Sequence, residues 1–477
     1  MTFSKEIESF IENYVKDLND DSASIFAGAG LSVSSGYVNW KELMSDLAKE
    51  LGLNIDDEND LISIAQYHVN ENGNNRYGIT KKILEEFTEH VEESENHIVI
   101  ARLPITSIWT TNYDQLIEKV LLNEKKNIDI KFKENQLLYT KPKRDVVLYK
   151  MHGDVSEPDS TILTKQDYEQ YFQTHETFIN ALRGELITKT FLFIGFSFSD
   201  PNLDYVLSRL HLRHGINKRK HYCFLKKNIL FDSQNPDEKI FTYNNIKQQL
   251  FINDLKRFGI STLLVEKYDE ITDVLKEIEF RYNKQTVFIS GSAEIYEPYT
   301  KNEALGFVHN ISKILIENNY KIVNGFGYGI GSSVINGALE TIFDNPNKYS
   351  ETQLTIKPFP QFKTGGTEVA ELWKIYRQNM ISKCGIAIFL FGNKNAGKIA
   401  DGVLKEFKIA NDKGLICIPI ASTEYASRNI YDEILKEPKK YYENPDEVLP
   451  YLEALSNFGN TIDFQLETLK KLLKLLK

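Results

Sequence analysis

The sequence predicts an α/β protein made of two doubly wound, parallel-sheet (Rossmann-like) domains. Short continuous apolar or β-branched runs alternate with segments of helical spacing, and such runs are typical of strands buried on both faces of a parallel sheet. The alternation restarts at residue 286 after the polar stretch 280–285, and 477 residues are too many for one ordinary core. We therefore expect a first domain over residues 1–283 and a second domain over residues 284–477.

In the first domain, apolar residues recur at helical spacing between Lys5 and Leu18, which predicts an N-terminal helix. The expected strands are residues 24–27, 105–111, 146–151, 191–194, 221–225 and 262–265. Helical stretches separate these strands, and this arrangement favours parallel crossover connections.

In the second domain, the expected strands are residues 286–289, 321–323, 354–357, 386–391 and 415–420. The tail Phe464–Leu476 carries leucines at helical spacing, and we expect a docked helix whose leucines serve the core or a subunit contact.

Composition and charge narrow the classes of function. The net charge of −10 disfavours nucleic acid as a main partner, because phosphate binding needs a basic face. The three cysteines, Cys223, Cys384 and Cys417, are widely separated and form no CxxC pair, which favours a reducing compartment. The acidic, amphipathic N-terminus is unlike a signal peptide, and no apolar run has the length of a membrane span. We expect a cytoplasmic protein with no membrane partner.

Four short segments of the first domain, each directly after an expected strand, carry residues that can bind a nucleotide. They are Gly28-Ala29-Gly30-Leu31-Ser32, Thr110-Thr111-Asn112-Tyr113-Asp114, His152-Gly153-Asp154 and Gly195-Phe196-Ser197-Phe198-Ser199-Asp200. Because the carboxyl ends of parallel strands line the ligand crevice of an open sheet, we expect the four segments to converge there.

Each segment taken alone also has a structural explanation. Val33 stands where the dinucleotide fingerprint has its third glycine, so the glycine pair can be a tight turn. Asn112 and Asp114 can cap a helix, and a single histidine such as His152 can be structural. The functional reading is that the glycines admit a diphosphate, Asn112 holds a ribose hydroxyl or a water, and His152 accepts a proton.

Taken together, the order of the four segments resembles the sirtuin family over about residues 20–270. The resemblance implies that Asn112 engages the nicotinamide ribose of NAD and that His152 is the catalytic base. It implies that the rest of the dinucleotide is held by Ala27, Gly28, Ala29, Gly30, Ser32, Asp114, Gly195, Phe196 and Ser197.

Two departures from the sirtuin pattern change the expected reaction. The two CxxC pairs of the zinc ribbon are absent, so no metal is expected, and residues 36–40 replace the family's Asp-Phe-Arg segment. The acyl-lysine cleft depends on these features, so water is the expected acceptor and the expected products are nicotinamide and ADP-ribose. An NAD-dependent deacylase and a nucleotide-binding module without turnover remain alternatives.

The second domain carries a second candidate nucleotide site. Ser290, Gly291 and Ser292 follow its first expected strand, and alternate glycines at 325, 327, 329 and 331 precede a helix, as in a phosphate cradle. With Arg377 on a helix and with Gly402 and Glu406 further on, this order resembles the SLOG superfamily, which includes nucleotide phosphoribohydrolases. The family's Pro-Gly-Gly is missing, so binding without turnover is expected. The candidate residues for a signal nucleotide are Ser290, Gly291, Ser292, Gly325, Gly327, Gly329, Arg377, Lys394, Gly402 and Glu406.

Two alternatives stay open for the second domain. Arg377 and Glu406 can form a surface or interdomain salt bridge, and the domain can itself be a phosphoribohydrolase. A sirtuin-like domain followed by a SLOG-like domain resembles the NAD-hydrolysing effectors of bacterial Thoeris anti-phage defence. That resemblance implies a homotetramer, with further assembly into filaments. It also implies activation by a cyclic ADP-ribose isomer that a partner TIR-domain enzyme makes, and NAD depletion in an infected cell.

Overall fold

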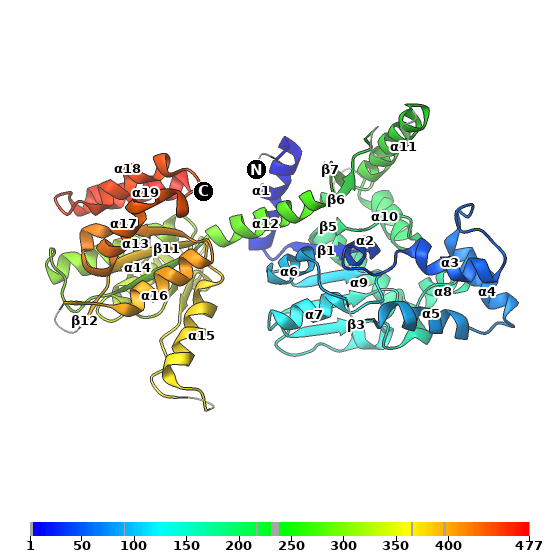
Figure 1. Ribbon diagram of the computed structural model, residues 1–477, viewed down its shortest axis with the longest axis horizontal. Coiled ribbons are helices and arrows are strands. Elements are labelled where there is room, and N and C mark those ends of the chain that lie inside the picture. Colours follow the sequence, from blue (N-terminus) through cyan, green and yellow to red (C-terminus); the bar gives the residue numbers. More distant parts are fainter. Residues whose placement is uncertain are drawn as a thin grey trace. The chain divides into compact units, whose positions relative to one another are not determined.

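The computed structural model describes residues 3–89, 91–215, 218–229, 238–363, 366–394 and 397–476, without the side chains of residues 213 and 214. The chain forms two compact units, Met1–Glu279 and Phe280–Lys477 (Figure 1). The division falls within helix α12 (Asp269–Lys284), so most of the polar stretch 280–285 is helical. The domain boundary at residue 283 stays a prediction.

The first unit is built on a seven-stranded, entirely parallel sheet. Its strands are β1 (Ala23–Ala27), β2 (Ser107–Thr110), β3 (Ile128–Lys131), β4 (Val146–Lys150), β5 (Thr190–Ile194), β6 (His221–Lys226) and β7 (Ile260–Val265), in the order β3-β4-β2-β1-β5-β6-β7. The predicted fold class is confirmed. Only β3 is missing from the strands predicted for this unit. Its isoleucines alternate with the charged residues Asp129 and Lys131, so it does not form the continuous apolar run that marked the other strands.

The register of four neighbouring strands determines where the site can lie. Ala27 at the end of β1 pairs with Thr110 at the end of β2 and with Ile194 at the end of β5. Thr110 in turn pairs with Lys150 at the end of β4. The four segments that follow these strands therefore leave the sheet side by side and at the same level.

Helices cover both faces of this sheet. They are α1 (Lys5–Asn19), α2 (Ala29–Val33), α3 (Trp40–Glu50), α4 (Leu61–Glu71), α5 (Tyr77–Phe87), α6 (Glu95–Arg102), α7 (Leu116–Asn123), α8 (Lys165–Thr174), α9 (Glu176–Thr188), α10 (Pro201–His214), α11 (Glu238–Arg257) and α12. The predicted N-terminal helix is confirmed as α1, which buries Phe10, Ile11 and Tyr14.

A small helical layer is inserted between β1 and β2. Helices α3, α4 and α5 lie together (Figure 1) and share a core that includes Leu43, Met44, Ile64 and Ile83. This core continues to Tyr113, in the segment after β2. The layer is therefore joined by packing to the carboxyl ends of the strands.

The second unit has a five-stranded parallel sheet in the order β10-β9-β8-β11-β14. Its strands are β8 (Thr286–Ser292), β9 (Lys321–Asn324), β10 (Leu354–Ile356), β11 (Ile386–Phe391) and β14 (Ile416–Pro419), and a separate hairpin pairs β12 (Asn393–Lys394) with β13 (Lys398–Ile399). Its longer helices are α13 (Lys301–Glu317), α14 (Gly331–Asp344), α15 (Val369–Ile381), α16 (Asp401–Asp412), α17 (Tyr425–Lys436), α18 (Pro445–Ser456) and α19 (Ile462–Leu475).

The C-terminal helix α19 is docked, as predicted. Its residues Leu466, Leu469, Leu472 and Leu473 belong to the core of the second unit. The hydroxyl of Tyr320 donates a hydrogen bond of 3.0 Å to the carbonyl of Leu473 and fixes the helix end. These leucines therefore serve the core.

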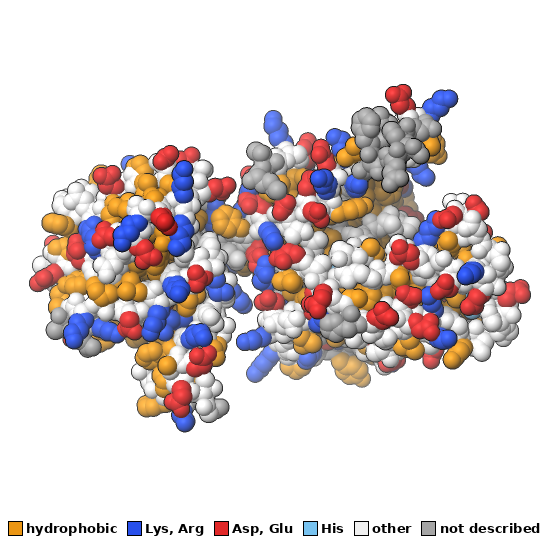
Figure 2. All heavy atoms as spheres, viewed as in Figure 1, with side chains coloured by type: hydrophobic (Ala, Val, Ile, Leu, Met, Phe, Trp, Pro, Cys, Tyr) orange, Lys and Arg blue, Asp and Glu red, His pale blue; other side chains and the backbone are white. Residues whose placement is uncertain are grey.

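Several general properties concern the described residues only. None of their helices combines the length and the apolar character needed to cross a membrane. They contain no grouping of three or more His, Cys, Asp or Glu side chains arranged to hold a metal ion. The three cysteines are free and buried. Acidic and basic side chains are interspersed over the visible face of each unit (Figure 2).

Candidate functional site

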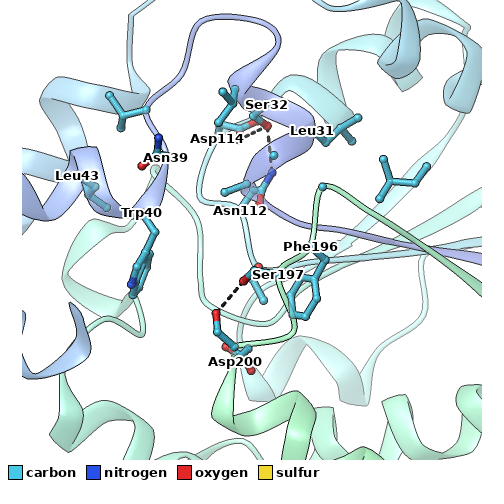
Figure 3. Close-up of a pocket in the computed structure, with 18 of the residues that line it drawn as sticks. Leu31, Ser32, Asn39, Trp40, Leu43, Asn112, Asp114, Phe196, Ser197 and Asp200 are labelled. Atoms are coloured by element: carbon cyan, nitrogen blue, oxygen red, sulfur yellow. Dashed lines mark hydrogen bonds between the residues drawn. The ribbon is translucent and has the colours of Figure 1, made fainter. Parts of the chain in front are cut away.

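The four predicted segments of the first unit border one cavity of about 880 Å³. Figure 3 labels residues from three of them, among them Ser32, Asn112 and Ser197. Asn112 and His152 both line the cavity, although they follow different strands. The other predicted residues that line it are Ala29, Gly30, Ser32, Asp114, Gly195, Phe196 and Ser197. Ala27 and Gly28 are not among its lining residues. The convergence expected from the sheet topology is therefore observed, and the chemical roles of these residues stay predictions.

The segment after β1 and the segment after β5 touch through their backbones. The N–H of Gly28 donates to the carbonyl of Ile194, and the N–H of Gly30 donates to the carbonyl of Gly195, each at 2.9 Å. A side chain on Gly28 would collide with Gly195, and one on Gly195 would collide with Leu31. Gly195 also has a φ of +64°, in the left-handed region that favours glycine. These glycines thus have a structural role, and Gly30 and Gly195 also line the cavity.

The amide of Asn112 is held by two hydrogen bonds. Its Nδ2 donates to the carbonyl of Gly28 at 3.2 Å and to Oγ of Ser32 at 3.0 Å. The hydroxyl of Ser32 then donates to Oδ2 of Asp114 at 2.8 Å (Figure 3). Because the carbonyl of Gly28 can only accept, the NH2 group must face it. The amide Oδ1 is buried and accepts no hydrogen bond from the described residues.

His152 lies beside a carboxylate that the sequence analysis did not single out. Its Nε2 is 3.1 Å from Oδ2 of Asp200, and this nitrogen has no well-aligned hydrogen-bond partner among the described residues. The hydroxyl of Tyr168 donates to the same Oδ2 at 3.4 Å. Both Asp200 and Tyr168 also line the cavity.

The charge state of Asp200 follows from these contacts. Burial raises the pKa of its carboxyl, but the neighbouring His152 and the N–H groups of Leu203 and Asn202 lower it more, so the net pKa lies below the usual range. The Asp-Pro pair at 200–201 is a helix-start signal, since Asp200 caps α10 by accepting from the N–H of Leu203 at 2.9 Å. That signal announces a helix and gives no indication of the contact with His152.

An apolar wall of the cavity comes from the inserted helical layer and its flanks. In Figure 3, Trp40 and Leu43 lie on the side opposite Phe196. The lining residues that sequence reasoning missed here are Val38, Trp40, Leu43, Leu61, Ile62 and Phe87. They follow no strand of the sheet, so the rule that located the four segments does not reach them. The wall gives the cavity an apolar face, as is common in pockets that bind small molecules.

In the second unit, three of the predicted residues form one cluster. The guanidinium Nε of Arg377 donates to Oε1 of Glu406 at 3.2 Å, and the hydroxyl of Ser290 donates to Oε2 of the same carboxylate at 2.6 Å. Gly402 is adjacent, because a Cβ there would lie 3.2 Å from Nη2 of Arg377. Burial raises the pKa of Glu406 and outweighs the opposing effects of Ser290 and Arg377.

Of the alternatives left open for Arg377 and Glu406, a salt bridge does form. The side chains of Arg377 and Glu406 are 12% and 10% exposed, and both residues belong to the second unit. The salt bridge is therefore neither at the surface nor between the domains. The two Nη groups of Arg377 donate to no other side chain or carbonyl in the described part of the chain. The guanidinium carbon lies 4.8 Å from the ring centre of Phe359 and 5.7 Å from that of Trp373. These two aromatic residues were missed by the sequence analysis.

The glycine-rich turn after β9 packs tightly against the end of β8. A side chain on Gly327 would collide with the carbonyl of Gly291, and one on Gly329 would collide with the carbonyl of Ala293. A Cβ on Gly325 would lie 2.8 Å from the ring of Phe359. Close packing therefore explains these glycines by itself, and their contact with a phosphate stays a prediction.

The remaining predicted residues of the second unit have other partners. Ser290, Gly291 and Ser292 all lie within β8 instead of after it, and the hydroxyl of Ser292 donates to the carbonyl of Asn393 at 3.1 Å. The ammonium of Lys394 pairs with the exposed carboxylate of Asp401. Lys394 is thus paired with a surface group, and its role toward a ligand stays a prediction.

Comparison with known proteins agrees with this architecture. Residues 106–248 match the family described as "SIR2-like domain", and residues 270–476 match the "Sir2- and TIR-associating SLOG family". The fold and the two sites thus define a sirtuin-like nucleotide-binding unit followed by a SLOG unit in one chain.

Relatives of the same length define the family more narrowly. The chain is 44% identical over 482 residues to "NAD(+) hydrolase ThsA" of Bacillus cereus, and the match covers 100% of each chain. It is 42% identical to proteins of the same name from Cytobacillus dafuensis and Acinetobacter baumannii, with 100% of this chain covered in each case and 97% and 99% of the relatives. The chain belongs to the ThsA family of NAD(+) hydrolases.

Proposed function

We propose that this chain hydrolyses the N-glycosidic bond of NAD+ and releases nicotinamide and ADP-ribose. The observation that carries the proposal is that Asn112 and His152 border the same cavity. An amide and an imidazole at one glycosidic carbon are a sufficient set of polar groups for hydrolysis by water. The names of the full-length relatives support the same reaction.

The proposed chemistry requires few groups. Water forms a bond to C1′ of the ribose while the C1′–N bond breaks. The electron pair of the broken C1′–N bond stays on the pyridinium nitrogen and neutralises it. The leaving group is then neutral nicotinamide, which needs no general acid. His152 takes the proton that the water loses, and Asn112 orients the ribose or the water. Asp200, held as a carboxylate, stabilises the imidazolium that forms.

The NAD-binding residues follow from the same cavity. Asn112, Ser32 and Asp114 form a connected set that can hold the ribose hydroxyls. We propose that the backbone at Ala29 and Gly30 and the Gly195-Phe196-Ser197 turn approach the diphosphate, and that Ala27 and Gly28 support this turn from behind the cavity wall.

We further propose that the second unit binds a cyclic ADP-ribose isomer and that binding activates hydrolysis. The support is the two Nη groups of Arg377, which are suited to a phosphate, beside the carboxylate of Glu406, which can accept from ribose hydroxyls. An NADase without control would exhaust its own cell, so the active state must be rare until a ligand with higher affinity for it arrives.

The biological context is proposed on the same basis. The name of the matched SLOG family couples it to TIR domains, which supports a partner TIR-domain enzyme as the source of the signal. We propose that NAD depletion then halts phage multiplication by stopping the infected cell. We also propose a cytoplasmic homotetramer that extends into filaments as the working form.

The experiment is an assay of nicotinamide release by the full-length protein, with and without cyclic ADP-ribose isomers. We expect release that rises when one isomer is added, and a loss of about a hundredfold or more in both His152→Ala and Asn112→Ala, with the fold of both variants intact. Full activity in either variant would refute the assigned site. Activity without any response to the isomers would refute the proposed activation and leave hydrolysis intact.

A further inference from the structure

Lys150, the last residue of β4, is a buried cation next to the candidate site. Its side chain has 0% exposed surface. Its Nζ donates to the carbonyl of Asp114 at 2.6 Å, to the carbonyl of Tyr113 at 3.3 Å and to Oε1 of Glu118 at 2.8 Å. It also forms an ion pair with Oδ2 of Asp154. The ammonium therefore has acceptors on several sides and no contact with solvent.

These partners belong to the two loops that carry the candidate catalytic residues. Tyr113 and Asp114 directly follow Asn112, and Asp154 lies two residues after His152. Two further bonds join the same loops. Nε2 of Gln115 donates to Oδ1 of Asp154 at 2.8 Å, and the N–H of Val155 donates to the carbonyl of Tyr113 at 3.0 Å. Lys150 and Asp154 thus link the loop after β2 to the loop after β4.

Stability alone is a weak explanation for the buried ion cluster around Lys150. Burial lowers the pKa of Lys150, but Glu118 and Asp154 raise it more, so the ammonium stays charged. A buried ion cluster gains little stability over apolar side chains of equal size, because desolvation offsets most of the attraction. Its hydrogen bonds are directional, however, and they set the separation of the groups they join. A small error in such a separation has a large effect on a reaction that depends on orientation.

We propose that Lys150 and Asp154 are positioning residues that fix the loop of Asn112 against the loop of His152. The inference rests on the proposed hydrolysis of NAD. Glu118 completes the charge balance of the cluster, but it lies on α7 and belongs to neither loop. This difference between the two carboxylates allows a matched comparison.

The test compares Asp154→Asn with Glu118→Gln in the full-length protein. Each variant replaces one carboxylate by its amide and leaves Lys150 paired with the other. We expect kcat for nicotinamide release to fall about tenfold or more in Asp154→Asn, with KM within about threefold of the wild-type value. We expect Glu118→Gln to keep kcat within about twofold. Equal changes in kcat in the two folded variants, or no change in Asp154→Asn, would overturn the proposal.

Amide hydrogen exchange of a peptide that contains Val155 gives a readout independent of turnover. We expect faster exchange than wild type in Asp154→Asn and not in Glu118→Gln, because the Val155 N–H bonds the carbonyl that Lys150 holds. A wild-type protein that releases no nicotinamide with any of the cyclic ADP-ribose isomers would refute the proposed function, and exchange alone would then decide: equal rates in Asp154→Asn and wild type overturn the link. Should Asp154→Asn fail to fold, Gln115→Leu removes the second link between the loops, while Oδ1 of Asp154 keeps the N–H of Ser156 at 2.8 Å, and the same outcomes decide.

Discussion

The Nε2 atom of His152 lies 3.1 Å from Oδ2 of Asp200, with side chains that are only 3% and 9% exposed. A carboxylate this close to an imidazole stabilises the charged form that appears when the ring accepts a proton. The carboxylate remains ionised at neutral pH because its pKa lies below the usual range. In the proposed reaction, Asp200 therefore assists His152 without itself taking the proton.

Asp200→Asn tests this relationship with little disturbance of the fold. Asparagine is as good a helix N-cap as aspartate, so α10 should still begin at Pro201. We expect kcat to fall by roughly tenfold to a hundredfold, because the amide cannot stabilise an imidazolium. Steady-state nicotinamide release is the measurement. Asp204→Asn, at an exposed position on the same helix, is the control and should keep kcat within about twofold. Equal activity in the two variants would exclude a role for the Asp200 charge.

Sequence reasoning located the parts of the site that lie directly after strands of the sheet. Continuous apolar strands predicted the parallel sheet, and the strand-end rule placed Asn112 and His152 on one cavity. It listed Asp200 in the segment after β5 but did not predict its contact with His152, because a contact across two loops depends on the path of the chain after β5. It missed Trp40, which comes from the helical layer between β1 and β2. Lys150 reads in the sequence as an ordinary charged strand end, and only the packing shows that it is buried.

Gly195→Ala tests the close contact between the segments after β1 and β5. A Cβ there would collide with the backbone at Leu31, and the φ of +64° is unfavourable for alanine. We expect the free energy of unfolding to fall by about 2 kcal/mol or more, together with weaker NAD binding. Denaturant unfolding and calorimetry are the measurements. Gly184→Ala, in the middle of α9 with nothing within 4 Å, is the control and should raise stability by roughly 0.5–1 kcal/mol. A neutral Gly195→Ala would show that the two segments can separate without cost.

Arg377→Ala tests the proposed signal site of the second unit. We expect the affinity for the activating cyclic ADP-ribose isomer to fall by about a hundredfold or more, because the guanidinium offers a phosphate two Nη groups that donate to nothing in the described part of the chain. Calorimetric titration of the full-length protein is the measurement. Lys374→Ala removes a cation one turn earlier on the same helix, where Lys374 faces Glu371 at 3.8 Å, and should leave the affinity within about twofold. If both variants bind the nucleotide like wild type, the site lies elsewhere.

His221 should make the protein sensitive to acid. Its Nδ1 accepts the N–H of Phe191 at 3.1 Å, so a proton cannot enter there without breaking that bond. Burial, with help from the charges of Arg219 and Lys218, lowers the pKa of His221 to about 3. In the unfolded chain the pKa returns to about 6.5. Between these values the unfolded state binds more protons, so stability falls as the pH falls below about 6.5 and stops falling near 3.

The matching variant is His221→Asn, whose Oδ1 can still accept the N–H of Phe191 but cannot titrate. Between about pH 7 and about pH 5, we expect the wild-type free energy of unfolding to drop by about 2 kcal/mol more than that of the variant. Urea unfolding curves at the two pH values give both numbers, and the pH 7 comparison reports any cost of the substitution itself. A wild type and a variant that lose the same stability on acidification would show that His221 takes up a proton in the folded state, against the environment described here.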